Sequence, residues 1–239
     1  MLSIIIPTLN EEKILEKTLK ALAPLAIEHE IIVSDGGSTD STIAIAQKYT
    51  RRVIQNTAGQ KQNIAIGRNL GAKAALGEFL VFLDADVQIP DINNFFQKAF
   101  FLFNKEKKLT GLTVFLKVFP EHATLADKFF FQLVNFIHYI ANNWLKWGSA
   151  SGEFQMIRAS AFKTVNGYDE NLVVGEDNKI FSKLAKIGTT RVETGLHVLH
   201  TCRRAHKTGW AQLLSLWMLN NIWNQIFKRS FSKEWKVIR

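Results

Sequence analysis

The sequence predicts an α/β protein built on an open, mostly parallel sheet that is flanked by helices. Through the first half, runs of β-branched residues alternate with helical patterns, as in consecutive βαβ units. The run 78–83 is almost continuously apolar, which is typical of a strand buried on both faces of a parallel sheet. With 47% hydrophobic and 21% charged residues, the 239-residue chain can bury a sizeable core, and its 1 cysteine excludes an intramolecular disulfide framework.

The elements of the first half follow in chain order. Residues 2–7 predict a strand, and Asn10 is a candidate cap for a helix whose apolar face includes Leu15 and Leu19. A second strand at 30–34 ends in the turn Asp35-Gly36-Gly37-Ser38. The elements that follow are a helix through Ile43 and Ala46, a strand at 52–55, a helix at 60–76 and the strand at 78–83. Ligands are expected beyond the carboxyl ends of these strands.

The second half is less regular. Its predicted elements are a helix at 91–104, strands at 109–119, 153–158 and 191–199, and helices at 159–165 and 177–186. Two stretches, 129–145 and 208–227, contain no formally charged side chain. No internal repeat or linker interrupts the chain, so we expect one continuous domain over residues 1–239.

The formal net charge of +9 is concentrated at one end of the sequence. Residues 1–199 carry 22 Lys and Arg against 20 Asp and Glu, whereas residues 200–239 carry 8 against 1. The excess therefore belongs to a C-terminal tail and not to a whole basic domain. Because no nucleic-acid-binding motif accompanies it, no nucleic-acid partner is expected.

The compartment is predicted from the N-terminus and from cysteine usage. No basic leader with an apolar run and a cleavage site precedes the first strand, so a secretory signal is not expected. The single thiol, Cys202, agrees with a reducing, cytoplasmic setting.

Three acidic motifs are candidates for chemistry. Asp84-Ala85-Asp86 follows a predicted buried strand, where two carboxylates can hold one hard cation that neutralises a diphosphate, although such a pair is often only a solvated turn. In the turn at Asp35, the carboxylate can accept hydrogen bonds from a nucleotide base while Gly37 lets a ligand approach, or the motif is simply good turn chemistry. Glu176-Asp177 can supply a general base or can favour the dipole of a helix start.

Several segments in this order resemble the family 2 glycosyltransferases, which have the GT-A fold. They are residues 4–11, 33–40, 68–72, 78–86, 152–154, 165–170 and 175–177. The resemblance implies transfer of a sugar from a nucleotide sugar with inversion at the anomeric carbon, helped by Mg²⁺ or Mn²⁺. It divides the single GT-A domain into a nucleotide-sugar-binding half (1–105), an acceptor-side half (106–205) and a basic amphipathic helical tail (206–239).

The resemblance also implies roles for individual residues. Asp177 is the expected catalytic base, Asp86 the direct metal ligand, and Asp84 and His200 further metal ligands. Residues expected to bind the nucleotide sugar are Pro7, Thr8, Asn10, Glu11, Asp35, Gly37, Arg68, Asp84, Ala85, Asp86, Glu176, Arg203 and Arg204. Among them, Arg203 and Arg204 are expected at the diphosphate, because a guanidinium binds phosphate oxygens bidentately.

The acceptor is inferred from the same motifs. Glu176-Asp177 favours a hydroxyl acceptor, since a phosphate acceptor is already anionic and needs no base. However, Asp-Ala-Asp followed by Gln88 also resembles the metal-binding turn of polyprenyl-phosphate mannosyltransferases, so a polyprenyl-phosphate glycosyltransferase is an alternative. A catalytically silent sugar-nucleotide-binding or scaffold protein is another. The Gln-x-x-Arg-Trp pattern of processive synthases is absent, which favours the addition of single sugars.

The uncharged stretch 208–227 has the length of a bilayer span but contains five Asn and Gln residues, so a transmembrane helix is not expected. With Lys207 before it and Lys228 and Arg229 after it, segment 208–229 suits a helix lying in the headgroup region. Ordinary core packing or a homodimer interface are alternatives. The stretch 129–145, between two lysines, has a similar character. The interpretation is an enzyme on the inner face of the cell membrane, acting on a lipid-linked or membrane-proximal acceptor.

Overall fold

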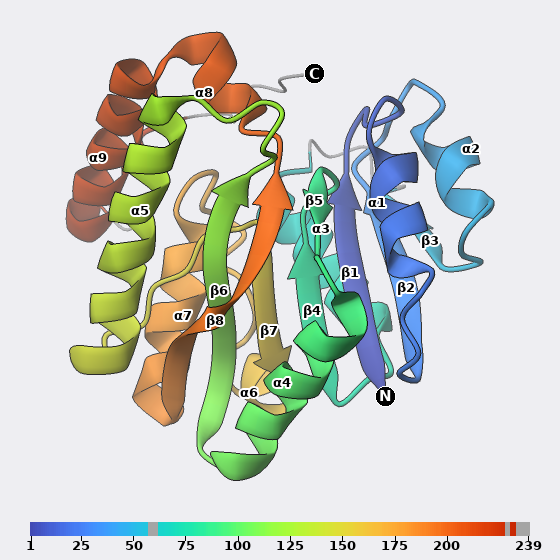
Figure 1. Cartoon of the computed structure of the whole chain (residues 1–239), viewed down its shortest axis with the longest axis horizontal. Helices are drawn as coiled ribbons and strands as arrows, with labels where there is room; N and C mark the ends of the chain where they lie inside the picture. The colour runs from blue at the N-terminus through green and yellow to red at the C-terminus, as the bar shows by residue number, and fades with distance from the viewer. Residues whose placement is uncertain (57–61, 228–229, 233–239) are drawn as a thin grey trace.

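The computed structural model describes residues 1–56, 62–227 and 230–232. Within these residues the chain forms a sheet of eight strands in the order β3-β2-β1-β4-β7-β6-β8-β5, with helices on both faces (Figure 1). The strands are β1 (Leu2–Thr8), β2 (His29–Asp35), β3 (Val53–Gln55), β4 (Phe79–Leu83), β5 (Val87–Gln88), β6 (Leu109–Val118), β7 (Phe154–Arg158) and β8 (Thr189–His200). Because β3, β2, β1 and β4 run parallel and only β7 and β5 run against their neighbours, the prediction of a mostly parallel mixed sheet is confirmed.

The helices divide into two layers. They are α1 (Leu15–Leu22), α2 (Thr42–Gln47), α3 (Ile64–Ala74), α4 (Ile92–Lys105), α5 (Leu125–Tyr139), the π-helix η1 (Ile140–Trp144), α6 (Ala159–Thr164), α7 (Glu176–Ile187), α8 (Arg203–Thr208) and α9 (Trp210–Phe227). One hydrophobic core joins a face of the sheet to α1, α4 and α5, and a second joins the opposite face to α3, α6 and α7. The sheet therefore has a buried apolar layer on each side, as a parallel sheet requires.

The parallel register sets where ligands can meet the sheet. Thr8 at the end of β1 lies opposite Asp35 at the end of β2, and β4 ends nearby at Leu83. The carboxyl ends of these strands point to the upper edge in Figure 1, where α8 also lies. This edge is the position at which open α/β sheets bind ligands.

Asn10 does not cap the first helix, so that prediction is wrong. Helix α1 begins only at Leu15, with Ile14 before it and no side-chain cap. Asn10 adopts a left-handed backbone conformation with φ 55°, its N–H donates to Ser38 Oγ at 2.7 Å, and its Oδ1 accepts from the Thr39 N–H at 2.8 Å. The side chain therefore joins the loop after β1 to the loop after β2, since these hydrogen bonds hold it away from the helix start.

Other boundaries shift for local reasons. Asn63 caps α3 by accepting from the Ile66 N–H at 2.9 Å, so the helix begins later than the predicted residue 60, which lies outside the described residues. Helix α5 begins four residues before the uncharged stretch 129–145, because Thr124 and Asp127 form a reciprocal capping box. The sequence pattern also missed β5, which is too short to show a period.

The C-terminal segment folds as α8 and α9 against the edge of the α5 layer. Trp210 stacks on Phe130 of α5 with ring centroids 4.6 Å apart, and Leu213 is buried. Among the described residues, no helix combines the length and apolar character that a bilayer span requires. Lys228 and Arg229, and the tail beyond residue 232, lie outside the described residues.

Candidate active site

Arg68 of α3 is the centre of the candidate site. Its side chain is 1% exposed, and its Nη2 donates to Asp84 Oδ1 at 3.0 Å while its Nη1 donates to Glu176 Oε1 at 2.9 Å. Nη2 also donates to the Gly152 carbonyl at 3.0 Å, and a Cβ on Gly152 would lie 2.6 Å from that nitrogen, so only glycine leaves room for it. Arg68 was expected to bind the nucleotide sugar, but its burial and three engaged contacts favour a positioning role.

Asp84-Ala85-Asp86, called the acidic turn below, connects β4 to β5. Burial raises the pKa of Asp84 to about 7, although the charge of Arg68 opposes the shift. Ala85 is 4% exposed, and its carbonyl accepts from Thr18 Oγ1 of α1 at 2.6 Å. The backbone of the turn is thereby fixed to the sheet and to α1, which holds the two carboxylates in place.

Arg203 lies between two acids in the described structure. Its Nε donates to Asp86 Oδ2 at 3.1 Å, and its Nη1 and Nη2 donate to the two oxygens of Glu11 at 3.0 and 3.3 Å. The Thr201 hydroxyl also donates to Asp86 Oδ2. Arg203 was expected at a diphosphate; it is held beside the acidic turn, where a diphosphate would compete with Glu11 and Asp86 for the same guanidinium.

Asp35 organises the loop after β2. The Thr8 hydroxyl donates to its Oδ2 at 3.0 Å, and the N–H groups of Gly37 and Ser38 donate to its Oδ1 at 2.9 and 2.7 Å. Gly37 has φ 97°, a left-handed conformation that favours glycine. Asp35 is 1% exposed, so its role in this structure is to shape the loop. Pro7, which was also expected to bind the nucleotide sugar, precedes Thr8 in β1 and lies opposite Ser34 of β2.

Glu176 and Asp177 open α7 on the other side of Arg68. Glu176 is 6% exposed, and burial raises its pKa while Arg68 opposes the rise. Burial, followed by the negative charge of Glu176, raises the pKa of Asp177 well above its ordinary value. A carboxylate with a raised pKa is a stronger base than an exposed one, which suits proton abstraction.

The acidic turn fits a divalent cation. Arg68 binds one oxygen of Asp84, Thr201 and Arg203 bind one oxygen of Asp86, and no described residue donates to the second oxygen of either carboxylate. Oxygen ligands of this kind suit Mg²⁺ or Mn²⁺. Glu11 and Glu176 also contact the guanidiniums that hold the acidic turn, so several carboxyl groups gather where a cation would bind.

His200 pairs with Val87, the residue that follows the acidic turn, and its role as a metal ligand with Asp84 and Asp86 stays a prediction. Within the described ranges, these three side chains do not form a group whose ligand atoms all lie within 4.8 Å of one another. The His200 ring instead packs edge-on against Phe131 of α5 at 4.6 Å, and its Nδ1 accepts from the Cys202 N–H at 3.3 Å. Gln88, the other candidate near the metal, pairs in β5 with Leu199 of β8.

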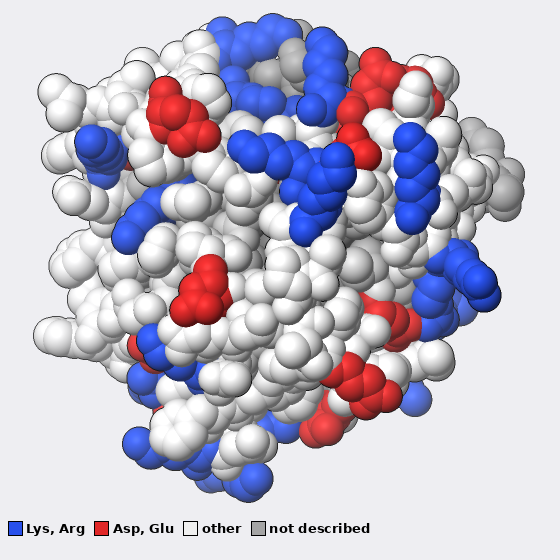
Figure 2. Space-filling model, turned by 45° about the vertical axis from the view of Figure 1, so that its right-hand side comes forward, with Lys and Arg blue, Asp and Glu red and all other residues white. Residues whose placement is uncertain are grey.

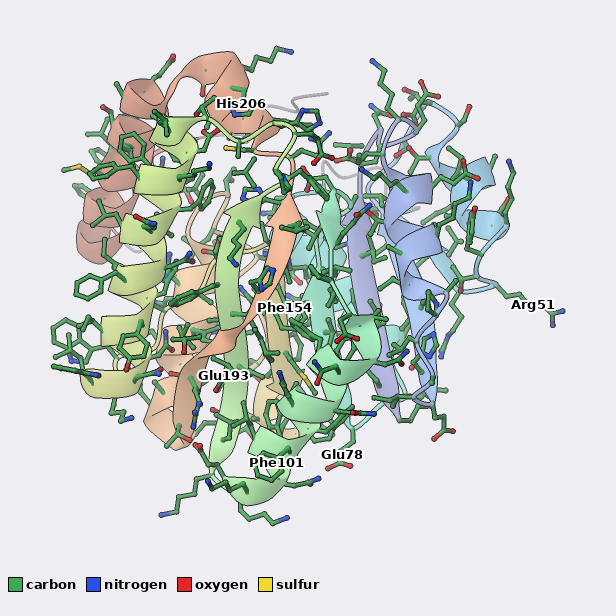
Figure 3. The ribbon with its side chains drawn as sticks, in the orientation of Figure 1. Arg51, Glu78, Phe101, Phe154, Glu193 and His206 are labelled. Carbon is green, nitrogen blue, oxygen red and sulfur yellow. The ribbon has the colours of Figure 1, made fainter. Side chains whose placement is uncertain are left out.

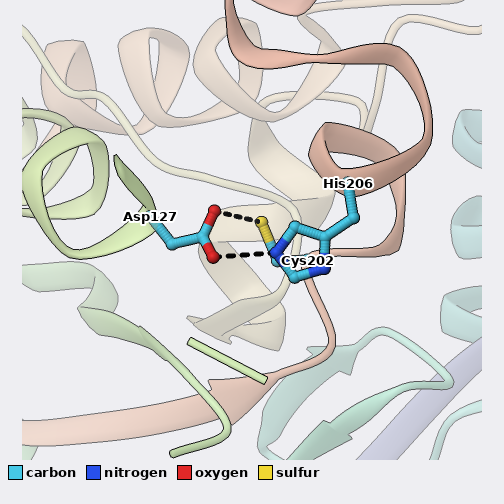
Figure 4. A group of neighbouring side chains, drawn as sticks. All are labelled: Asp127, Cys202 and His206. Carbon is cyan, nitrogen blue, oxygen red and sulfur yellow. Dashed lines mark hydrogen bonds and ion pairs between the residues drawn. The ribbon is translucent and has the colours of Figure 1, made fainter. Parts of the chain in front are cut away.

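Sequence reasoning missed two residues near the site. Thr201 orients Asp86, as described above. Asp127 of α5 is 0% exposed and accepts from His206 Nε2 at 2.8 Å, Trp210 Nε1 at 2.8 Å and Cys202 Sγ at 3.6 Å (Figure 4). The spacing of Thr124 and Asp127 is a capping-box signal that could have revealed the residue but not its partners.

Asp127 fastens the segment that carries the two arginines. Although burial raises it, the hydrogen bonds from His206, Thr124 and Trp210 hold the pKa of Asp127 well below its usual range. Arg204 lies in the same short helix, and its carbonyl accepts from Thr208 Oγ1 at 2.8 Å. Figure 2 shows Lys and Arg side chains gathered at this upper end of the molecule, beside a group of Asp and Glu.

The sheet order and the acidic turn at its carboxyl edge define a protein of the GT-A type. The family model for glycosyl transferase family 2 matches residues 3–165, which is more than half of the chain. The chain therefore belongs to glycosyl transferase family 2, and the expected family and fold are confirmed.

Individual relatives cover different parts of the chain. A 4,4'-diaponeurosporenoate glycosyltransferase of Staphylococcus haemolyticus is 39% identical over 92 residues, or 37% of this chain and 24% of that protein. A GalNAc(5)-diNAcBac-PP-undecaprenol beta-1,3-glucosyltransferase of Campylobacter jejuni is 36% identical over 93 residues, or 37% of this chain and 30% of that protein.

A solved structure shares the fold at low sequence identity. The mannosyltransferase PcManGT from Pyrobaculum calidifontis, in complex with GDP-Man and Mn²⁺, has a TM-score of 0.74 at 17% identity, covering 94% of this chain and 64% of that one. The chain thus spans less than two thirds of each of these three proteins.

Proposed function

We propose that the protein transfers single sugars from a UDP- or GDP-sugar to a hydroxyl acceptor, with inversion at the anomeric carbon. The observation that carries the proposal is the double contact of Arg68, which lies 3.0 Å from Asp84 and 2.9 Å from Glu176. One buried guanidinium thus joins a turn suited to a cation and diphosphate to the helix start that bears Asp177. This arrangement supports donor binding on one side and an acceptor hydroxyl on the other.

The donor is proposed to bind along the carboxyl ends of β1, β2 and β4. Thr8, Asn10 and the loop ordered by Asp35 would enclose the base and ribose, and Asp84 and Asp86 would hold Mg²⁺ or Mn²⁺. When bound, such an ion neutralises the charge that develops on the leaving diphosphate. The complex of PcManGT with GDP-Man and Mn²⁺ supports a nucleotide sugar and a divalent ion on this fold.

Asp177 is proposed to act as the general base. It takes the proton of the acceptor hydroxyl while that oxygen attacks the anomeric carbon. The bond from the anomeric carbon to the diphosphate oxygen breaks, and its electron pair leaves with the nucleoside diphosphate. Arg203, released from Glu11 and Asp86, can pair with that diphosphate through two parallel hydrogen bonds, and Arg204 is proposed to assist.

The acceptor is proposed to be lipid-linked. The name of the Campylobacter jejuni relative specifies an undecaprenol-linked glycan, which supports an acceptor of this chemistry. The protein would then work in the cytoplasm at the inner face of the cell membrane. Contact through segment 208–229 and a homodimer both stay predictions, and a polyprenyl phosphate stays the alternative acceptor.

Transfer assays test this function. The protein is incubated with UDP- and GDP-sugars, Mn²⁺ and either a polyprenol-linked glycan or a polyprenyl phosphate, and release of nucleoside diphosphate is measured. Asp177→Asn should abolish transfer to the hydroxyl while donor binding persists, and Glu28→Gln, on an 80% exposed side chain, is the matched control. Transfer to the lipid phosphate that survives Asp177→Asn would establish the alternative acceptor. No release from any donor would leave only a sugar-nucleotide-binding protein.

A further inference from the structure

Helix α5 packs on the protein through the buried Phe131 and two polar side chains, and it exposes a large apolar face. Its side facing the protein buries an acid and an amide: Asp127 is 0% exposed and Asn135 is 8% exposed, with Asn135 bonded to both the N–H and the carbonyl of Leu116. Its outward side presents large apolar side chains to solvent. They are Leu125 at 84% exposed, Phe129 at 63%, Leu133 at 45%, Phe136 at 59% and Ile137 at 52%.

These five side chains form one continuous surface, called the apolar stripe below. At about 100° per residue, their spacing places them within a sector of about 120° on the helix. The stripe continues past α5, where Trp144 is 70% exposed and Trp147 is 67% exposed. A helix that buries two polar side chains together with Phe131 and exposes five large apolar ones presents a surface suited to an apolar medium.

The exposed charged side chains within the segment that carries the stripe, residues 125–147, are both lysines, while the exposed Glu121 lies just before the helix. Between residues 122 and 152 the only acid is the buried Asp127, while Lys128 and Lys146 are both exposed. A second copy of the chain would bring the same lysines to this face without an exposed acid from residues 122–152 to pair with them. An anionic lipid surface supplies both the apolar layer and the negative charge, and tryptophans favour the boundary between them.

We propose that the apolar stripe of α5, with Trp144 and Trp147, rests in the headgroup region of an anionic membrane. Helix α9 lies beside α5 in Figure 1, through the stacking of Trp210 on Phe130, and it also carries the exposed Met218 and Leu219. The proposal rests on the proposed function, because contact with a membrane serves an enzyme whose acceptor is lipid-linked. It assigns the primary contact to α5, whereas segment 208–229 is secondary.

The direct test is sedimentation with vesicles of phosphatidylcholine, with and without phosphatidylglycerol. The double variant Phe129→Ser/Phe136→Ser should lower the partition coefficient at least about tenfold, because each change removes a phenyl ring from the bilayer interface. Phe101→Ser is the matched control, because the Phe101 ring is 62% exposed but belongs to α4 and not to α5. In Figure 3 it lies at the end of the molecule opposite to His206 of α8. Lys128→Gln/Lys146→Gln should weaken binding only to vesicles that contain phosphatidylglycerol.

Three results would overturn the proposal. In the first, the double variant binds vesicles as well as the wild-type protein does. In the second, the wild-type protein does not bind vesicles. In the third, the wild-type protein sediments as a dimer and the double variant as a monomer. The last result would assign the stripe to contact between copies. Stabilisation by a nucleotide sugar, measured on the same samples, keeps the two proposals apart, because vesicle binding without donor binding would refute the function and leave the surface in place.

Discussion

Replacing Arg68 with methionine tests whether this side chain holds the two halves of the site together. In the structure the guanidinium is 1% exposed and contacts Asp84 and Glu176, whose side chains are 27% and 7% exposed. Methionine fills much of the same volume but leaves both carboxylates without their cation. The loss is therefore electrostatic, with little change in packing.

The expected magnitude follows from the burial of the pair. Removing one partner of a buried ion pair costs about 3–5 kcal/mol, because the remaining charge is left uncompensated in a poorly solvated place. Domains are stable by roughly 5–15 kcal/mol, so the free energy of unfolding should fall by a large fraction. Arg51→Met is the matched control, since Arg51 is exposed and points away from the fold (Figure 3), and its effect should stay within about 0.5 kcal/mol.

Urea unfolding followed by tryptophan fluorescence measures both variants. Adding Glu176→Gln to Arg68→Met should restore part of the loss, because the second change removes one of the unpaired charges. Lowering the pH from 8 to 5 should also favour Arg68→Met relative to the wild-type protein, since protonation neutralises the same carboxylates. A loss below about 1 kcal/mol, or a double variant no more stable than the single one, would refute the central position of Arg68.

Three further predictions concern titration and positioning. Because the pKa of Asp177 is raised, transfer should decline as the pH falls through that raised value, which lies at a higher pH than for an ordinary carboxylate. A pH profile of kcat/KM measures the decline, and a rate unchanged down to pH 5 would contradict the prediction. Mn²⁺ affinity should weaken as the pH drops below about 7, where Asp84 takes up a proton, and calorimetry measures this; equal affinities at pH 6 and 8 would count against it. The same proton uptake should make the folded state more stable at pH 5 than at pH 8, because the raised pKa means that the folded state binds more protons than the unfolded state, and urea unfolding measures this opposite sign. Asp127→Asn should cost about 2 kcal/mol of stability, because the amide accepts fewer of the hydrogen bonds from His206 and Trp210, whereas Lys128→Ala next to it should change little; equal effects would remove Asp127 from its role.

Sequence patterns predicted the elements that have a strong period. The strands β1 and β4 and the helix α4 lie within two residues of the predicted boundaries, because each buries a regular set of apolar side chains. Short elements such as β5 carry no period and were missed. The cap at Asn10 failed because its partners, Ser38 and Thr39, belong to a loop that only the parallel register brings close.

The candidate site was predictable as a set of residues but not as a set of contacts. The acidic turn and Glu176 were recognised from their motifs, and the fold brings both to Arg68. Arg203 was expected to face a phosphate, and its pairing with Glu11 arises from the approach of segments 192 positions apart. Pairings of this kind depend on tertiary distance, which neither spacing nor composition encodes.

Thermal unfolding with a panel of UDP-, GDP- and dTDP-sugars, each with and without Mn²⁺, tests most directly whether the carboxyl edge of the sheet is a metal-assisted nucleotide-sugar site. A ligand present at about 100 times its dissociation constant adds about 2.7 kcal/mol of stability, so the shift is readily measured. We expect stabilisation by a UDP- or GDP-sugar that requires Mn²⁺ and that disappears in Asp86→Asn. Stabilisation by none of the sugars, or by one of them equally in Asp86→Asn, would contradict the account.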